Sequence, residues 1–274
     1  MAAETQYTAN TGLVKISTAN SNLDGTGTLG TVITGASNGT LIKNVIIKAT
    51  DTGSGSTSQG MVRLFIYDGS STLLLKEVDI PAMGQSSTDA TFETVIPLNF
   101  KLESGHVLKA STQNATGFNV IAEGLDFAYY ASSVRPESTN YTANTGAATI
   151  TTQNTALDGS GTLATLVTAG ASGSGWKGLA INSISLKAYT DVTRGMLRLF
   201  IQNTGTGASN TFLFTEIPLF PVDASATFQS YHWVVPFLST LQIQAGYKIC
   251  ATIESTAGQN VSGVVDAMDW KYPA

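Results

Sequence analysis

The chain has 274 residues, of which 42% are hydrophobic and 12% are charged, and its formal net charge is −5. Because it has no basic patch to neutralise phosphates, nucleic acid is excluded as a main ligand, and no apolar run approaches the roughly 20 residues that span a membrane. The single cysteine, Cys250, excludes an internal disulfide and is expected to be a buried, small hydrophobic residue.

In chain order, the predicted elements are strands separated by turns. Residues 1–6 form a polar arm without the basic and apolar regions of a signal peptide, so we expect synthesis in the cytoplasm. In the clearest strand, Val62, Leu64 and Ile66 share one face by the two-residue period. No stretch has the apolar spacing of an amphipathic helix. Runs bounded by Gly, Ser, Asn and Asp predict strands near 7–17, 28–34, 41–50, 60–67, 72–80, 92–100, 106–113 and 118–130.

The second half of the chain repeats the first. The segment Tyr7–Gly12 (YTANTG) recurs letter for letter at Tyr141–Gly146, and two further matches join 23–29 to 157–163 and 60–66 to 195–201. Eight strands in about 135 residues, without helices, are typical of the jelly roll. The sequence therefore predicts an all-β fold of two tandem, internally duplicated jelly-roll-like β-sandwich domains, covering residues 1–133 and 134–274. A short linker containing Pro136 joins them.

Two repeated polar loops are the first candidates for a site. They contain Asp24-Gly25 and Asp158-Gly159, and oxygen-rich loops of this kind can hold calcium, which takes six to eight oxygen ligands. Each loop offers only one carboxylate, however, and Asp-Gly is also an ordinary turn sequence. We therefore keep Asp24 and Asp158 as calcium candidates, prefer the turn interpretation, and predict no cofactor.

Two repeated charges are candidates for structural ion pairs. Arg63 and Arg198 occupy the same position in the two halves, and Asp126 and Asp269 also correspond. This shared retention predicts an Arg63–Asp126 pair, repeated as Arg198–Asp269. The two histidines, by contrast, have no counterparts in the other half, which gives no support to a catalytic triad or a histidine-bound zinc ion. No catalytic residue is predicted.

All three tryptophans lie in the second half of the chain. Trp270 replaces Phe127 and Trp176 replaces Leu41, which are positions suited to packing. Trp233 replaces the polar Thr94, so its ring is expected to be exposed. Because an exposed aromatic ring can stack on the face of a sugar, Trp233 is the candidate ligand-binding residue.

Four segments resemble structural proteins of tailed bacteriophages: 7–12, 23–29, 60–69 (GMVRLFIYDG) and 102–110 (LESGHVLKA). The nearest resemblance is to jelly-roll virion proteins of crAss-like and related phages, and it covers both halves. It implies a capsid- or tail-associated role, as a decoration protein, head fibre or wall component. The implied partners are copies of the chain itself and other virion proteins. The resemblance transfers no active-site residue.

These observations predict a non-enzymatic structural protein of a phage virion that acts through protein–protein interfaces. One alternative is a carbohydrate-binding or host-adhesion module that takes a surface glycan at Trp233. Another is a double jelly-roll coat protein that forms the shell itself, which the small loops make less favourable. An enzyme is disfavoured because the paired carboxylates or metal ligands of such sites are missing from the sequence pattern.

Overall fold

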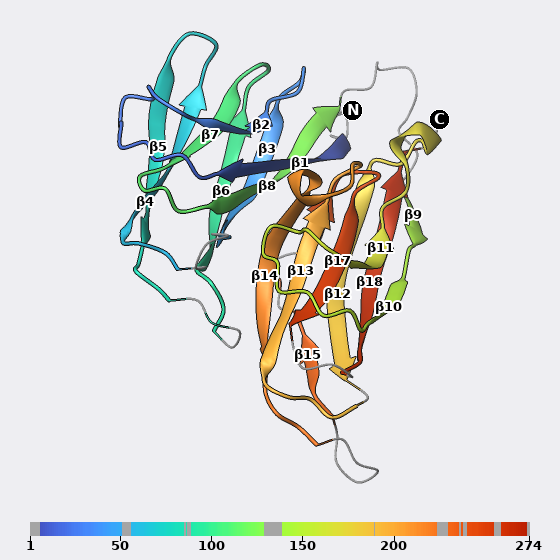
Figure 1. The fold of residues 1–274 in the computed structure, drawn as a ribbon. Helices are drawn as coiled ribbons and strands as arrows, with labels where there is room; N and C mark the ends of the chain where they lie inside the picture. Colours follow the sequence, from blue (N-terminus) through green and yellow to red (C-terminus); the bar gives the residue numbers. More distant parts are fainter. Residues whose placement is uncertain are drawn as a thin grey trace. The chain divides into compact units, whose positions relative to one another are not determined.

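The structure is a computed structural model that describes residues 6–50, 56–84, 86, 89–128, 139–188, 190–223, 230–235, 237, 240–254 and 259–272. The chain divides into two compact units, one made of 1–84, 91–140 and 271–274 and the other of 85–90 and 141–270 (Figure 1). The boundary predicted at 133/134 and the linker at Pro136 lie outside the described residues. Within the described ranges, no helix is long and apolar enough to cross a membrane.

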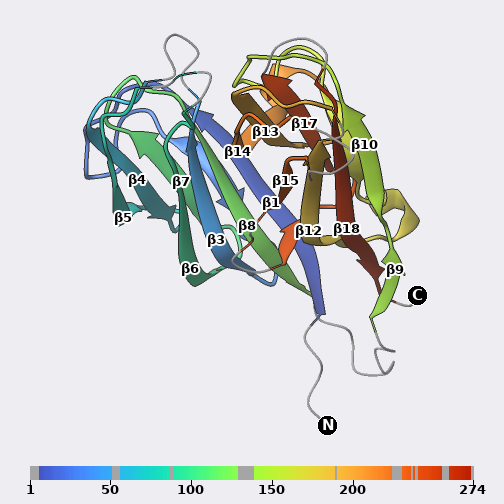
Figure 2. The same ribbon diagram turned by 90° about the horizontal axis from the view of Figure 1, so that it is seen from below.

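The first unit is a sandwich of two four-stranded antiparallel sheets, with strand orders β1-β8-β3-β6 and β2-β7-β4-β5 (Figure 2). The strands thus pair from the outside inwards: first with eighth, second with seventh, third with sixth and fourth with fifth. This is the pairing of a jelly roll. The bounds are β1 (Gln6–Ile16), β2 (Gly30–Thr34), β3 (Thr40–Ala49), β4 (Gly60–Tyr67), β5 (Thr72–Ile80), β6 (Glu93–Leu102), β7 (Val107–Thr112) and β8 (Phe118–Ala128).

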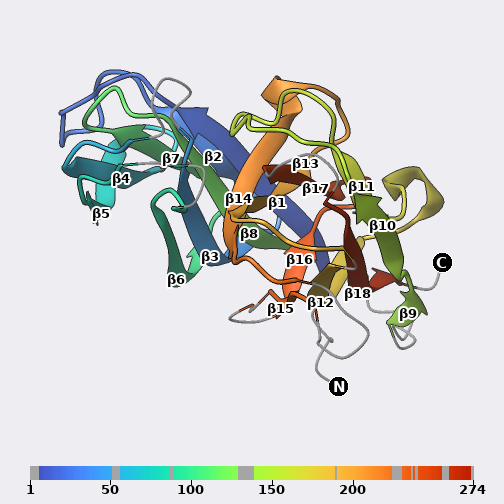
Figure 3. The same ribbon diagram turned by 60° about the horizontal axis from the view of Figure 1, so that its bottom comes forward.

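The second unit repeats this order in the sheets β10-β18-β12-β15 and β11-β17-β13-β14. The place of β6 is shared by β15 and β16, which both pair with β12 (Figure 3), and β9 pairs with β18. The bounds are β9 (Asn140–Ala143), β10 (Gly146–Ile150), β11 (Ala164–Thr168), β12 (Gly178–Ala188), β13 (Gly195–Gln202), β14 (Thr211–Leu219), β15 (His232–Val234), β16 (Leu241–Ile243), β17 (Lys248–Glu254) and β18 (Val261–Lys271); short 3-10 turns are η1 (Ser172–Ser174) and η2 (Ala208–Asn210). The predicted all-β, duplicated jelly-roll fold is confirmed.

Irregularities of the sheets are repeated as well. Each unit has one extra residue in its second strand, one in its third and one in its fifth, and each such residue forms a β-bulge that locally twists the strand. The bulged positions are Val32, Lys43 and Leu75 in the first unit, and Leu166, Asn182 and Phe214 in the second. The two units therefore share backbone detail as well as strand order.

The core of the first unit lies between its two sheets, on the faces that the two-residue period predicts. Val62 and Leu64 are fully buried, and Ile66 packs against the same cluster. Fully burying one such side chain contributes about 1.5–3 kcal/mol. On the opposite sheet, Val45 and Ile47 are also fully buried. Side chains between these positions point away from the core, so polar residues of each strand are accommodated there.

Candidate functional site

The repeated segment YTANTG supplies an asparagine that holds an aspartate of the last strand. Asn10 Nδ2 donates to Asp126 Oδ1 at 2.9 Å, and Thr40 Oγ1 donates to the same oxygen at 2.5 Å. In the second unit, Asn144 Nδ2 donates to Asp269 Oδ2 at 2.7 Å. The repeat thus fastens the first strand of each unit to its last strand.

The glycine of the same segment allows two strands to approach closely. A Cβ atom on Gly12 would lie 2.4 Å from the carbonyl oxygen of Val32, and one on Gly146 would lie 2.1 Å from that of Leu166. Both distances are far inside van der Waals contact, so only glycine fits without a backbone shift. The most similar segment of the two halves is therefore explained by packing and hydrogen bonding within each jelly roll.

The arginine of β4 and its equivalent on β13 have glutamate partners. Arg63 Nε donates to Glu77 Oε1 at 2.8 Å. Arg198 Nε donates to Glu216 Oε1 at 2.9 Å, and its Nη2 donates to Glu254 Oε2. Each arginine is buried, and each glutamate lies on a strand adjacent to the arginine in the same sheet.

The predicted pairs Arg63–Asp126 and Arg198–Asp269 are therefore not the pairs that form. The arginines alternate with core residues along β4 and β13, so they point away from the opposite sheet. The aspartates belong to that opposite sheet, on β8 and β18. All four residues have internal polar partners, which agrees with the structural role that the sequence predicted for them.

Each arginine also holds the loop that precedes the second strand of its unit. Arg63 Nη1 donates to the carbonyl of Asn20 at 3.3 Å, and Arg198 Nη1 donates to that of Asn154 at 3.3 Å. The two asparagines close their own loops, because Asn20 Nδ2 donates to Thr26 O at 2.9 Å and Asn154 Nδ2 donates to Ser160 O at 2.7 Å. The loops are thereby fixed over the outer face of the sheet.

The two calcium candidates lie in these loops, and both carboxylates accept hydrogen bonds from the turn itself. Asp24 Oδ1 accepts from Thr26 Oγ1 at 2.7 Å and from Thr26 N at 3.0 Å, and these bonds lower the pKa of the Asp24 carboxyl. Asp158 Oδ1 accepts from Ser160 N at 2.8 Å. Among the described residues, no group of three or more His, Cys, Asp or Glu side chains is placed to hold a metal ion. Turn formation accounts for the repeated aspartates.

Under the loop of the second unit lies a small apolar cluster that includes Cys250. Leu157 and Leu163 of the loop pack against Phe200, Leu213 and Cys250. Burial raises the pKa of the Cys250 thiol, which keeps it protonated and unreactive. The expectation of a buried, small hydrophobic cysteine is confirmed.

The two histidines lie in different units and have different surroundings. His106 Nε2 is 3.9 Å from Glu103 Oε2 in the turn before β7. His232 is exposed, and its Nε2 lies 3.1 Å from Ser185 Oγ on the neighbouring strand. The two histidines thus have different neighbours and do not share one site.

The exposure expected for Trp233 is confirmed: 43% of the residue is accessible. It lies in the middle of the edge strand β15, where His232 and Val234 are also exposed. Trp270 is only 4% exposed and Trp176 is half-buried, as expected for packing positions. Trp233 is thus the most exposed of the three tryptophans.

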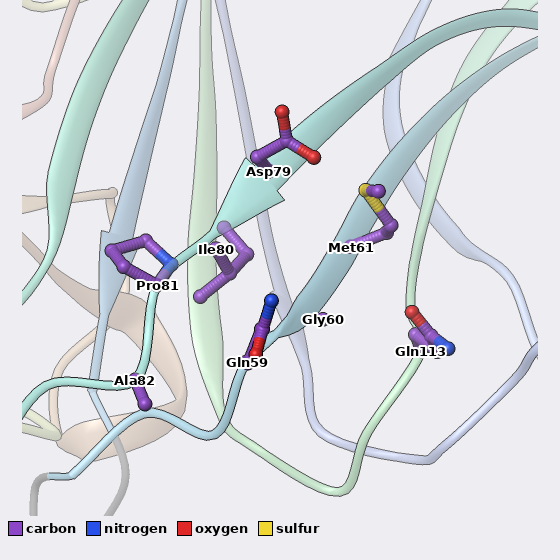
Figure 4. Close-up of a pocket in the computed structure, with 8 residues that line it drawn as sticks. All are labelled: Gln59, Gly60, Met61, Asp79, Ile80, Pro81, Ala82 and Gln113. Carbon is purple, nitrogen blue, oxygen red and sulfur yellow. The ribbon is translucent and has the colours of Figure 1, made fainter.

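A cavity of about 580 Å³ in the first unit was not predicted from the sequence (Figure 4). It opens where β4 begins and β5 ends, and its wall includes Met61 and Asp79, which are directly opposite each other on these strands. The rest of its lining is Gln59, Gly60, Ile80, Pro81, Ala82 and Gln113. No motif marks it in the sequence; at two of its positions the halves differ, with Pro218 and Glu254 in place of Asp79 and Gln113.

Comparisons with known proteins give no family for this chain. No family model matches it, and no curated protein matches it. Solved structures that align with it include a triple jelly-roll protein of turret assembly in an archaeal virus (13% identity, TM-score 0.26), PNGase F, a glycosylasparaginase from Flavobacterium meningosepticum (10%, 0.26), and a tandem CBM22 domain from Paenibacillus barcinonensis (10%, 0.24).

The alignments cover 98%, 96% and 97% of this chain, and 59%, 96% and 92% of the respective solved chains. The chain thus spans 59% of the length of the viral protein. At these identities and TM-scores the likenesses carry no argument about function. The jelly-roll assignment depends instead on the order in which the strands pair.

Proposed function

We propose that this protein is a non-enzymatic structural component of a tailed-phage virion, capsid- or tail-associated, which acts through protein–protein interfaces. The observation that carries the proposal is the duplication of a complete jelly roll, down to shared bulges and polar contacts. Each jelly roll presents sheet faces and loop ends that can tile in a symmetric assembly, and two in one chain can occupy two quasi-equivalent positions.

The polar residues that the two halves share support a structural role. Asn10 and Asn144 hold aspartates of the last strand, while Arg63 and Arg198 hold glutamates and a loop. These side chains all bind groups within their own unit. The residues that the two halves share therefore maintain the jelly-roll fold. In this proposal the partners are copies of the chain and other virion proteins, and the place of action is the virion.

The test is the solution mass of the purified chain by light scattering over a wide range of concentration. A defined multiple of 28.6 kDa would support a self-assembling virion part with symmetric interfaces. Closed shells in electron micrographs would favour the coat-protein alternative. The structural proposal would be refuted if the chain stayed a strict monomer at every concentration and also failed to bind purified particles of tailed phages.

A second candidate, a carbohydrate-binding or host-adhesion module, is favoured by one observation, the exposed ring of Trp233. Ser185 and His232 contact each other on the opposite face of the sheet from Trp233, so the ring itself is what favours this candidate. Glycans that stack on this ring would change tryptophan fluorescence, and Trp233→Ala would abolish the change. No fluorescence change with any glycan that the protein retains would contradict a site at Trp233.

A further inference from the structure

The cavity at the ends of β4 and β5 has the size and lining of a small-ligand site. Its volume of about 580 Å³ lies within the roughly 300–1,000 Å³ typical of such sites. Met61, Ile80 and Pro81 supply apolar wall, and polar side chains come from three segments: the residue before β4, the strand β5 and the residue after β7. Figure 4 shows these side chains around the opening.

Three polar side chains of the cavity have no internal task. The carboxylate of Asp79 and the amides of Gln59 and Gln113 make no side-chain hydrogen bond or ion pair with any residue that the structure describes. Their backbones, by contrast, are fixed: Gln59 O accepts from Asn114 Nδ2 at 2.8 Å, and Gln113 N donates to Met61 O at 2.8 Å. The backbone at Gln59 and Gln113 is therefore fixed, while the side chains of Gln59 and Asp79 are exposed to solvent.

The second unit shows that the jelly roll does not require these groups. The position of Asp79 is taken there by Pro218, which has no polar side chain, and that of Gln113 by Glu254, which pairs with Arg198. Residues that serve the fold, such as the buried arginine, are the same in both units. Gln59 corresponds to Arg194, so of the three polar positions only that of Asp79 becomes apolar in the second unit, and the other two change in charge.

We infer that this cavity binds a neutral saccharide, as a free sugar or as the end of a glycan. Sugar hydroxyls donate to a carboxylate such as Asp79, and the primary amides of Gln59 and Gln113 both donate to and accept from hydroxyls. Met61 and Pro81 offer apolar surface to the C–H face of the ring. A single carboxylate disfavours anions and is too few for a calcium cage. The site is independent of the proposed virion role and lies in the other unit from Trp233.

The experiment screens the labelled full-length chain on a glycan array and follows the retained sugars by saturation-transfer NMR. Asp79→Asn keeps the shape of the side chain but removes its charge, and we expect binding to weaken at least about tenfold. Ala82→Phe places a ring in the cavity and should abolish binding. Glu103→Gln, which alters an exposed carboxylate of the same unit, and Trp233→Ala should bind as the unchanged chain does.

Absence of any retained sugar would overturn the inference, as would binding that neither Asp79→Asn nor Ala82→Phe weakens. Loss of binding in Trp233→Ala alone would assign the sugar to the β15 surface and refute the cavity. Circular dichroism of each variant separates loss of binding from loss of fold. Because assembly is measured by light scattering without glycans, failure here leaves the virion proposal unaffected, and failure there leaves the cavity unaffected.

Discussion

Replacing Arg198 by methionine is the sharpest test of how the polar contacts hold the second unit. Arg198 is fully buried, and its partners are Glu216, Glu254 and the carbonyl of Asn154. Methionine retains much of the apolar stem but removes the guanidinium that binds both carboxylates. The Glu216 side chain is 0% exposed and that of Glu254 is 16% exposed, so water cannot replace the lost partner at the first and only partly at the second.

Removing one partner of a buried ion pair costs about 3–5 kcal/mol, and we expect Arg198→Met to lower the free energy of unfolding by that amount. The matched control is Arg63→Met in the first unit. Its partner Glu77 is 41% exposed and can be hydrated, so the expected loss is about 1–2 kcal/mol. The same substitution at equivalent positions should thus differ in cost because the burial of the glutamates differs.

The distribution of tryptophan makes the assay selective. All three tryptophans lie in the second unit, so their fluorescence follows its unfolding in urea, while circular dichroism follows both units. With a slope of about 1–3 kcal/mol/M, Arg198→Met should lower the fluorescence midpoint by at least about 1 M. The reasoning is refuted if the midpoint moves by less than this, or if Arg63→Met proves as costly as Arg198→Met.

Three further predictions concern single positions. Gly146→Ala should destabilise the second unit by about 1–3 kcal/mol through overpacking, whereas Gly173→Ala, where an added Cβ meets nothing, should change stability by less than about 0.5 kcal/mol in the same urea titration. The thiol of Cys250 should react with Ellman's reagent only on unfolding, and fast labelling of the native chain would contradict its burial. Backbone and side-chain hydrogen bonds lower the pKa of Asp68 from 3.8 to about 2, so its stabilising effect is complete above pH 3.8 and is lost as pH falls through 2. An NMR titration should show this value, and Ser70→Ala should raise it.

The strands could be predicted because apolar alternation is a local property. The strands expected at 60–67 and 72–80 are β4 and β5 with the same bounds, and the other predicted ends in the first unit differ by two residues or fewer. Pro97 lies on β6, which is an edge strand where a missing backbone N–H is tolerated, and Asn99 beside the irregularity adopts a φ of 47°. Strand order could not be predicted, because pairing depends on contacts between residues far apart in the chain.

Retention in both halves indicated which polar residues matter but could not identify their partners. Arg63 and Asp126 are both repeated, yet each binds another group. Glu77 is repeated too, as Glu216, so the sequence held two acidic candidates for one arginine. Side-chain direction decides between them, because Arg63 points outwards from its sheet and reaches only the neighbouring strand. The cavity escaped prediction for a related reason: its residues are scattered over 59–113 and form no motif.

Comparing the two units also distinguishes side chains that maintain the fold from side chains that differ at the surface. In the second unit Arg198 binds two carboxylates, whereas in the first unit Arg63 binds one, because the position of Glu254 is occupied by Gln113. The neutral amide of Gln113 places no charge beside Arg63. Its hydrogen-bond donor and acceptor line the cavity instead. At this position the two units therefore differ: the glutamate of the second unit pairs with the arginine, and the amide of the first unit lines the cavity.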